Sequence, residues 1–264
     1  RYWRDGSSDV CASDLNTPMK KYLYLLLFYC FSPALCAQFE FPTVLRDEDI
    51  VATCFDSEWD NETKSCFWKP NFYEQFKLDE EGTEAMETKI ATAFQCGDYR
   101  VIVAYSNGII GTGDCHACSP LISFIVLRKK DNAPKWELHN FNKYSEAKGA
   151  WGKMPRISVV EMNEATKLLF FELDYGNQGE DDTYLSIYAF DKELLSVVTF
   201  YTNAGRANSP EELCSFSTDI SIDKEKQQIR FHRKGTEYQG KYPDRKIVPV
   251  DEVKIYQFSS NKLT

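Results

Sequence analysis

The densest group of reactive side chains lies in one glycine-framed segment, residues 108–120, with the sequence GIIGTGDCHACSP. Five consecutive residues of this segment, 114–118, include two thiols, an imidazole and a carboxylate. Its glycines at 108, 111 and 113 allow backbone conformations that other residues avoid, so we expect a loop of defined shape. The candidate functional residues of this loop are Gly113, Asp114, Cys115, His116 and Cys118.

Three kinds of chemistry fit this loop. A local disulfide between Cys115 and Cys118 would tighten it and leave His116 on the surface, and this interpretation is favoured. A thiol-redox site is an alternative, but such C-x-x-C pairs sit at the start of a helix, whereas a β-rich run follows Pro120 here. A zinc or copper site using Cys115, His116 and Cys118 is the third alternative, although it lacks a local fourth ligand. We therefore predict no cofactor.

Two further groups of side chains could bind ligands. Acidic residues in residues 174–182 could hold calcium, but the spacing matches an EF-hand poorly and favours a solvated hairpin connection; the candidate ligands are Asp174, Asp181 and Asp182. Aromatic side chains in or near loops could stack on sugars or anchor a protein, and the candidates are Trp136, Trp151 and Tyr175. A pair of carboxylates for glycoside hydrolysis stays open, because sequence spacing does not fix the distance between them.

Short apolar arms and polar turns predict the elements that position these groups. Polar hairpin loops centre near Asp131, Asn163, Asp191 and Asp223, and β-rich arms flank each of them. The predicted fold is mainly β: an antiparallel meander of about ten strands with one N-terminal helix. A sandwich, an open barrel and a partial propeller-like array all fit this pattern.

Residues 99–264 are expected to form the all-β domain, after an irregular and helical extension over residues 38–98. Within that extension, residues 78–94 predict the helix, since acidic residues begin it and apolar residues recur on one side. The stretches FEFPTV and DIVATCF predict short strands.

Alternation along the strands assigns faces. Ile220, Ile222, Ile229 and Phe231 are expected to face the core, and Arg230, His232 and Lys234 to face water. The stretch KLLFFEL is apolar at both parities, which predicts a central strand that is covered on both sides.

Residues 19–37, MKKYLYLLLFYCFSPALCA, have the features of a secretory signal peptide. Two lysines precede an apolar run that is too short to span a bilayer, and a small-residue cleavage site precedes Gln38. Residues 1–18 precede this signal and are expected to be a non-native leader, such as translated adapter sequence. We therefore expect a periplasmic or extracellular bacterial protein with no transmembrane segment after removal of the signal.

The expected mature chain carries six cysteines, which in an oxidising compartment favours disulfides. They are Cys54, Cys66, Cys96, Cys115, Cys118 and Cys214. Fifteen pairings are open in principle; Cys54 with Cys66 and Cys115 with Cys118 are the local ones, which leaves Cys96 with Cys214. The net charge is −9 for the whole chain and −10 without residues 1–37, so nucleic acid is not an expected partner.

The glycine-framed loop, followed by GAWGKMPRISVV and LDYGNQGEDDTYLSIY, resembles a group of exported bacterial proteins of unknown function that combine a G-x-x-C-H-x-C loop with a β-meander. The resemblance covers about residues 99–214 and implies a common fold but no activity. It also implies a shared importance of Gly113, Cys115, His116, Cys118, Trp151, Gly152 and Gly179.

These observations favour a binding or interaction module at the cell envelope, with an envelope protein or a glycan as partner. No catalytic residue is assigned, and enzymatic activity is left open. The alternatives are a thiol-redox or metal-binding protein that uses the Cys115–Cys118 loop, and a carboxylate-dependent hydrolase.

Overall fold

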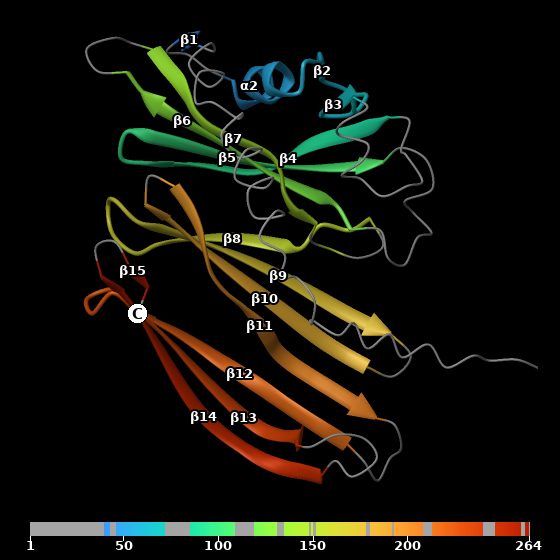
Figure 1. The fold of residues 1–264 in the computed structure, drawn as a ribbon, viewed down its shortest axis with the longest axis vertical. Helices are drawn as coiled ribbons and strands as arrows, with labels where there is room; N and C mark the ends of the chain where they lie inside the picture. Colours follow the sequence, from blue (N-terminus) through green and yellow to red (C-terminus); the bar gives the residue numbers. More distant parts are fainter. Residues whose placement is uncertain are drawn as a thin grey trace, which may run out of the picture.

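The structure is a computed structural model. It describes residues 40–42, 46–71, 85–108, 119–130, 135–147, 149, 152–177, 180–191, 193–207, 213–239, 246–259 and 262–263. Figure 1 shows these residues as a stack of antiparallel layers, with the chain running from the upper layers to the lower ones.

The first sheet has seven strands in the order β1-β7-β6-β5-β4-β3-β2. The central strands β4 to β7 follow one another through hairpins, and short β1, β2 and β3 extend the two edges. Their bounds are Glu40–Pro42 for β1, Trp59–Asp60 for β2, Ser65–Trp68 for β3, Met86–Cys96 for β4, Tyr99–Gly108 for β5, Leu121–Lys129 for β6 and Lys135–Ala147 for β7.

The second sheet has eight strands in the sequential order β8 to β15, so it is an uninterrupted meander. Their bounds are Arg156–Glu161 for β8, Lys167–Asn177 for β9, Glu180–Asp191 for β10, Glu193–Ala207 for β11, Leu213–Asp223 for β12, Gln228–Gln239 for β13, Lys246–Ser259 for β14 and Lys262–Leu263 for β15.

Three apolar cores separate the layers. The first lies between the helix α2 (Asp47–Cys54) and one face of the first sheet, where Ile50 and Val51 pack near Ile102. The second lies between the two sheets and joins residues of β4, β5 and β6 to residues of β9 and β10. The third lies between β9 and β10 on one side and β13 on the other. The second sheet therefore folds back under itself, as Figure 1 shows.

Strand β11 makes this fold possible. It pairs with β10 along nearly its whole length but with β12 only over Ala204–Ala207, opposite Leu213–Phe216. The β10–β11 ladder contains two register shifts, which add local twist and bend. We refer to β12, β13 and β14 together as the C-terminal layer.

The predicted fold class is confirmed, since the described residues are mainly antiparallel strands with one short helix. Of the three architectures that the sequence allowed, stacked sheets with a shared core correspond to the sandwich. The four predicted hairpin positions are confirmed as the connections β6–β7, β8–β9, β10–β11 and β12–β13. Strand β4, which lies in the predicted extension, pairs with β5, which lies in the predicted all-β domain. Residues on both sides of position 98 therefore belong to one sheet.

Two local predictions in the extension are wrong. Residues 86–94 of the predicted 78–94 helix belong to strand β4, residue 85 lies just before that strand, and residues 78–84 lie outside the described residues. The stretch DIVATCF, expected to be a strand, belongs mostly to α2. The predicted strand in FEFPTV is present as β1.

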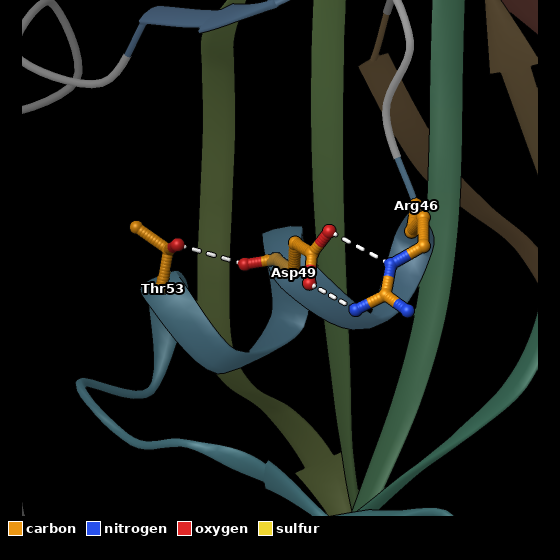
Figure 2. A network of polar contacts seen from close by, with 3 residues as sticks. All are labelled: Arg46, Asp49 and Thr53. Atoms are coloured by element: carbon orange, nitrogen blue, oxygen red, sulfur yellow. Dashed lines mark hydrogen bonds and ion pairs between the residues drawn. The ribbon is translucent and has the colours of Figure 1, made fainter. Parts of the chain in front are cut away.

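The helix α2 is held by its first turn and by its tether to the sheet. Asp47, Glu48 and Asp49 suit the positive end of the helix dipole. Figure 2 shows Arg46 donating two hydrogen bonds to the Asp49 carboxylate, at 3.0 and 2.7 Å, and Thr53 donating to the Asp49 carbonyl at 2.7 Å. Asp47 accepts two hydrogen bonds from Arg100 of β5, both at 2.6 Å, which fixes the helix on the first sheet.

The predicted faces of the C-terminal layer are correct for most residues. Ile229 and Phe231 are buried in the third core, Ile222 packs against it, and Arg230 and Lys234 are exposed. Ile220 pairs with Phe231 but is 36% exposed, so its predicted burial is wrong. The physical reason is that β12 pairs with β11 only up to Phe216. In the described ladder, no residue of β11 therefore lies beside Ile220.

The close approach of β12 to Gly235 of β13 is a testable feature of this layer. A Cβ at Gly235, where φ is +134°, would lie 2.2 Å from the Ser215 carbonyl oxygen and 2.7 Å from the Phe216 Cα. Gly235→Ala should therefore lower the free energy of unfolding by about 3 kcal/mol in urea titrations, because backbone atoms would have to move. Gly97→Ala is the matched control: φ is +55° there, but its Cβ would meet nothing within 4 Å. Equal losses for the two variants would contradict this account of Gly235.

Candidate functional site

The two ends of the glycine-framed loop are attached to one neighbouring segment. Residues 109–118, including Gly113, Asp114, Cys115, His116 and Cys118, lie outside the described residues. Before them, the Asn107 side chain donates to the Gly152 carbonyl at 3.1 Å. After them, the Ser119 hydroxyl donates to the Gly149 carbonyl at 2.6 Å. The loop thus leaves the sheet from an anchored base.

Gly149 is required for this anchoring. Its φ is +128°, and an added Cβ would lie 2.2 Å from the Lys153 carbonyl oxygen and 2.6 Å from the Pro120 Cδ. Only glycine allows the segment to approach Pro120 this closely. The sequence GAWGKMP, which the resemblance had grouped with the loop, is therefore next to both loop ends at Gly149 and Gly152. Trp151 and Gly179 lie outside the described residues.

A buried row of hydroxyl groups crosses the first sheet near the loop. Trp68 Nε1 donates to Thr88 Oγ1 at 2.8 Å, and the Thr88 and Ser106 hydroxyl groups are hydrogen-bonded at 2.6 Å. Thr88 and Ser106 are buried, so these bonds satisfy groups that would be costly to leave unpaired. The Lys143 Nζ lies 3.8 Å from the centre of the Trp68 ring, a cation–π contact. This row stabilises the sheet; it has no described base next to Ser106 that would make a nucleophile of it.

The predicted disulfide between Cys54 and Cys66 is not formed, and no disulfide involves Cys96 in the described part of the chain. Cys66 is fully buried in the first core, and Cys54 packs against that core. Cys96 lies in the second core, where its Sγ donates to the Glu164 carbonyl at 3.7 Å. Burial raises the pKa of the Cys66 thiol to about 11. Cys66 is buried because it packs among apolar side chains of the first core. The even number of cysteines therefore did not indicate a disulfide at this position. The side chain of Cys214 is outside the described part.

The acidic candidate at residues 174–182 belongs to the β9–β10 hairpin. Asp174 is on β9, where its carboxylate lies 2.9 Å from Arg156 Nη2 and accepts a hydrogen bond from Thr183 at 3.1 Å. Among the described residues, no three acidic, histidine or cysteine side chains are grouped as a metal site would need. Asp181 and Asp182 pair in the ladder with Gly176 and Tyr175, and their side chains are not described.

Of the three aromatic candidates, only Trp136 has a described side chain. Trp136 is on β7 and packs against the first core, so it is not an exposed platform for sugars. Tyr175 is on β9, but its side chain, like the whole of Trp151, is outside the described residues. Their predicted binding role stays a prediction.

Strand β14 carries a surface that was not recognised from the sequence. Ile247, Val253 and Ile255 project from its outer face and are 40%, 43% and 55% exposed. They belong to a short set of large apolar side chains that the structure describes as exposed, whose other members are Phe67 and Ile220. The outward side chains of the neighbouring strand are Arg230, His232 and Lys234, which pair with Ile255, Val253 and Asp251. Val253 and Ile255 thus lie beside a basic row, and Ile247 lies farther along the same face, beyond Pro249 and Asp251. We name this outer face of β14, with Ile247, Val253 and Ile255, the β14 surface.

Among the described residues, most of the outer edge of β14 also has no partner strand. β13 pairs with one side of β14 from Lys246 to Gln257. On the other side, the described residues provide a partner only at Phe258 and Ser259, which pair with β15. The sequence signal for this surface was weak, because the apolar residues of KIVPVDEVKIYQF occur at both parities.

One polar contact orders the β14 surface. His232 Nε2 lies 2.6 Å from Asp251 Oδ1. The hydrogen bond with His232 lowers the pKa of the Asp251 carboxyl group from its usual value, and the charges of His232 and Lys234 add to this effect. Asp251 therefore stays ionised at neutral pH and balances the basic row on β13.

No protein-family model, curated protein or solved structure matches this chain. The resemblance to exported bacterial proteins with a G-x-x-C-H-x-C loop stays a prediction. Among the described residues, no helix has the length and apolar character needed to cross a membrane.

The thiol of Cys66 gives a test of the buried-cysteine account. Its folded-state pKa of about 11 lies above the usual 9.0, so the stability it contributes is complete below pH 9 and is lost as the pH rises towards 11. The free energy of unfolding should fall more between pH 8 and pH 10.5 in the wild type than in Cys66→Ala. Mass spectrometry after alkylation at pH 8 should find Cys66 unlabelled when folded and labelled in denaturant without reductant. Labelling that requires a reductant would show a disulfide instead.

Proposed function

We propose that this chain is an exported β-protein that acts as a binding module at the cell envelope, and that the β14 surface is its contact surface. The observation that carries the proposal is the pair of exposed apolar neighbours Val253 and Ile255, with Ile247 farther along the same face, on a strand for most of whose outer edge the described residues provide no partner. Neighbouring exposed apolar side chains beside a strand edge without a partner suit an interaction site.

The chemistry of the β14 surface favours a polypeptide over a glycan as the partner. Sugars are bound by aromatic faces, and Trp136 packs against the first core. Branched aliphatic side chains beside a strand edge without a described partner instead suit another strand, which would pair with the backbone and cover these side chains.

Catalysis has less support among the described residues. Ser106 is buried in the hydroxyl row, and the Asp174 carboxylate is paired with Arg156. A thiol-redox or metal-binding role for Cys115 and Cys118 rests on the sequence of the loop alone, as does the alternative of a carboxylate-dependent hydrolase.

Export is proposed on the sequence of residues 19–37, with its lysine pair, short apolar run and small-residue cleavage site. A chain exported in this way would present the β14 surface to other components of the envelope. The acidic net charge of the mature chain makes nucleic acid an unsuitable partner.

Capture from envelope extract tests the binding role of β14. Immobilised wild-type protein should retain envelope proteins that Ile255→Ser fails to retain, because serine removes most of the apolar contact at the most exposed position. Phe67→Ser is the matched control, since Phe67 is 41% exposed on β3, in the other sheet. Equal retention by both variants, or no retention by the wild type, would contradict the proposal.

Processing of the N-terminus tests export separately. When residues 19–264 are produced in a bacterium, intact-mass measurement of the envelope and medium fractions should find a chain that begins at Gln38. Leu26→Arg places a charge in the apolar run and should leave the uncleaved chain in the cytosol. Uncleaved wild-type chain in the cytosolic fraction would refute the export proposal and leave the binding proposal intact.

A further inference from the structure

We propose that the partner of the β14 edge is a second copy of this chain, with the two β14 strands paired antiparallel about a two-fold axis at Val253. This inference rests on the proposed function, because it names the partner of the same surface. The pairing would join the C-terminal layers of two molecules into one continuous sheet.

The extent of the open edge limits the pairing. β15 occupies the edge at Phe258 and Ser259, so a second strand can pair only before that point. With Val253 opposite its own copy, residues 249–257 of one chain lie opposite 257–249 of the other. Nine residues in each strand give a ladder about 30 Å long. The described part of the chain leaves this whole span without a strand on its outer side.

Charge selects this register. Centring on Val253 places Glu252 opposite Lys254 of the partner copy, and Lys254 opposite the partner copy's Glu252. Within one chain these two side chains already form an ion pair of 3.3 Å on the same face. Directly opposed unlike charges stabilise an antiparallel pair, and like charges destabilise it. Moving the centre by one residue would oppose either two copies of Glu252 or two copies of Lys254.

The apolar side chains meet at the centre of the outer face and on the inner face. On the outer face, Val253 meets its own copy, and Ile255 lies diagonal to that copy and directly opposite Asp251 of the partner copy. On the inner face, Tyr256 comes opposite Val250 of the other copy. Tyr256 packs edge-on against Phe231 at 5.3 Å, so the new contact would extend the third core across the interface.

Pro249 is compatible with the ladder. A proline within a sheet occurs on an edge strand, with the side that lacks its N–H turned away from the neighbouring strand. This places the backbone groups of residues 251, 253 and 255 on the open side, because alternate residues point the same way. These residues are central in the proposed ladder, and Pro249 is at its end, where one missing hydrogen bond costs least.

Charge reversal with mixing tests the pairing in the mature chain. Sedimentation equilibrium of the wild type should show a monomer–dimer equilibrium, and Glu252→Lys and Lys254→Glu should each sediment as monomers at the same concentration. A one-to-one mixture of the two variants should recover the dimer, because every opposed pair is then of unlike charge. The double variant should also dimerise. Recovery on mixing cannot be produced by variants that merely fail to fold.

The outcomes separate this inference from the binding proposal. A wild type that is monomeric, a dimer that neither single reversal weakens, or a series of larger species would overturn the Val253-centred pairing. If such a protein still captures envelope components through Ile255, the binding proposal stands without the dimer. If it captures nothing, both fail.

Discussion

The constraint on which this fold depends is that its central strands are apolar on both faces. In β9, Leu168 and Phe170 contribute to the third core, and Leu169 and Phe171 contribute to the second. A strand of this kind is stable only if each face is covered, so the chain needs one layer above β9 and another below it. The first sheet provides one cover and the C-terminal layer provides the other.

The need for a second cover explains why the chain continues after β11. The bent β10–β11 ladder and the short β11–β12 pairing let β12, β13 and β14 turn under β9 and β10. Ile229 and Phe231 then close the third core. The outer face of this layer carries the exposed side chains of Val253 and Ile255. The β14 surface is thus a direct consequence of how the core is closed.

Much of the β architecture could be predicted from the sequence because hairpins are local. Polar turns at Asp131, Asn163, Asp191 and Asp223 separate apolar arms, and two-sided burial of KLLFFEL follows from its composition alone. The extension was misread for a specific reason. A register shift between Ile90 and Thr92 in β4 brings Met86, Ile90 and Ala93 to the same core. Their spacing of four and three residues is that of a helix, so the bulge imitates a helical period.

The misassignment of α2 has the complementary cause. Ile50 and Val51 are β-branched and favour a strand, but the acidic first turn and the tether from Asp47 to Arg100 stabilise a helix of eight residues. That tether joins positions 53 residues apart, so no local pattern contains it. The same holds for the base of the glycine-framed loop, where Asn107 and Ser119 are anchored by Gly152 and Gly149.

The sequence of β14 also shows how one strand can both avoid and permit association. Charged residues and proline on an edge strand are the usual means by which proteins prevent strands from adding to a sheet. Pro249, Glu252 and Lys254 are of this kind. Centred on Glu252 or on Lys254, two β14 strands would oppose like charges, whereas centred on Val253 they oppose Glu252 to Lys254, and the cost that remains is Asp251 opposite Ile255 on the exposed outer face. These charges therefore disfavour the neighbouring registers of two β14 strands and favour the one in which Glu252 and Lys254 face each other across the two copies.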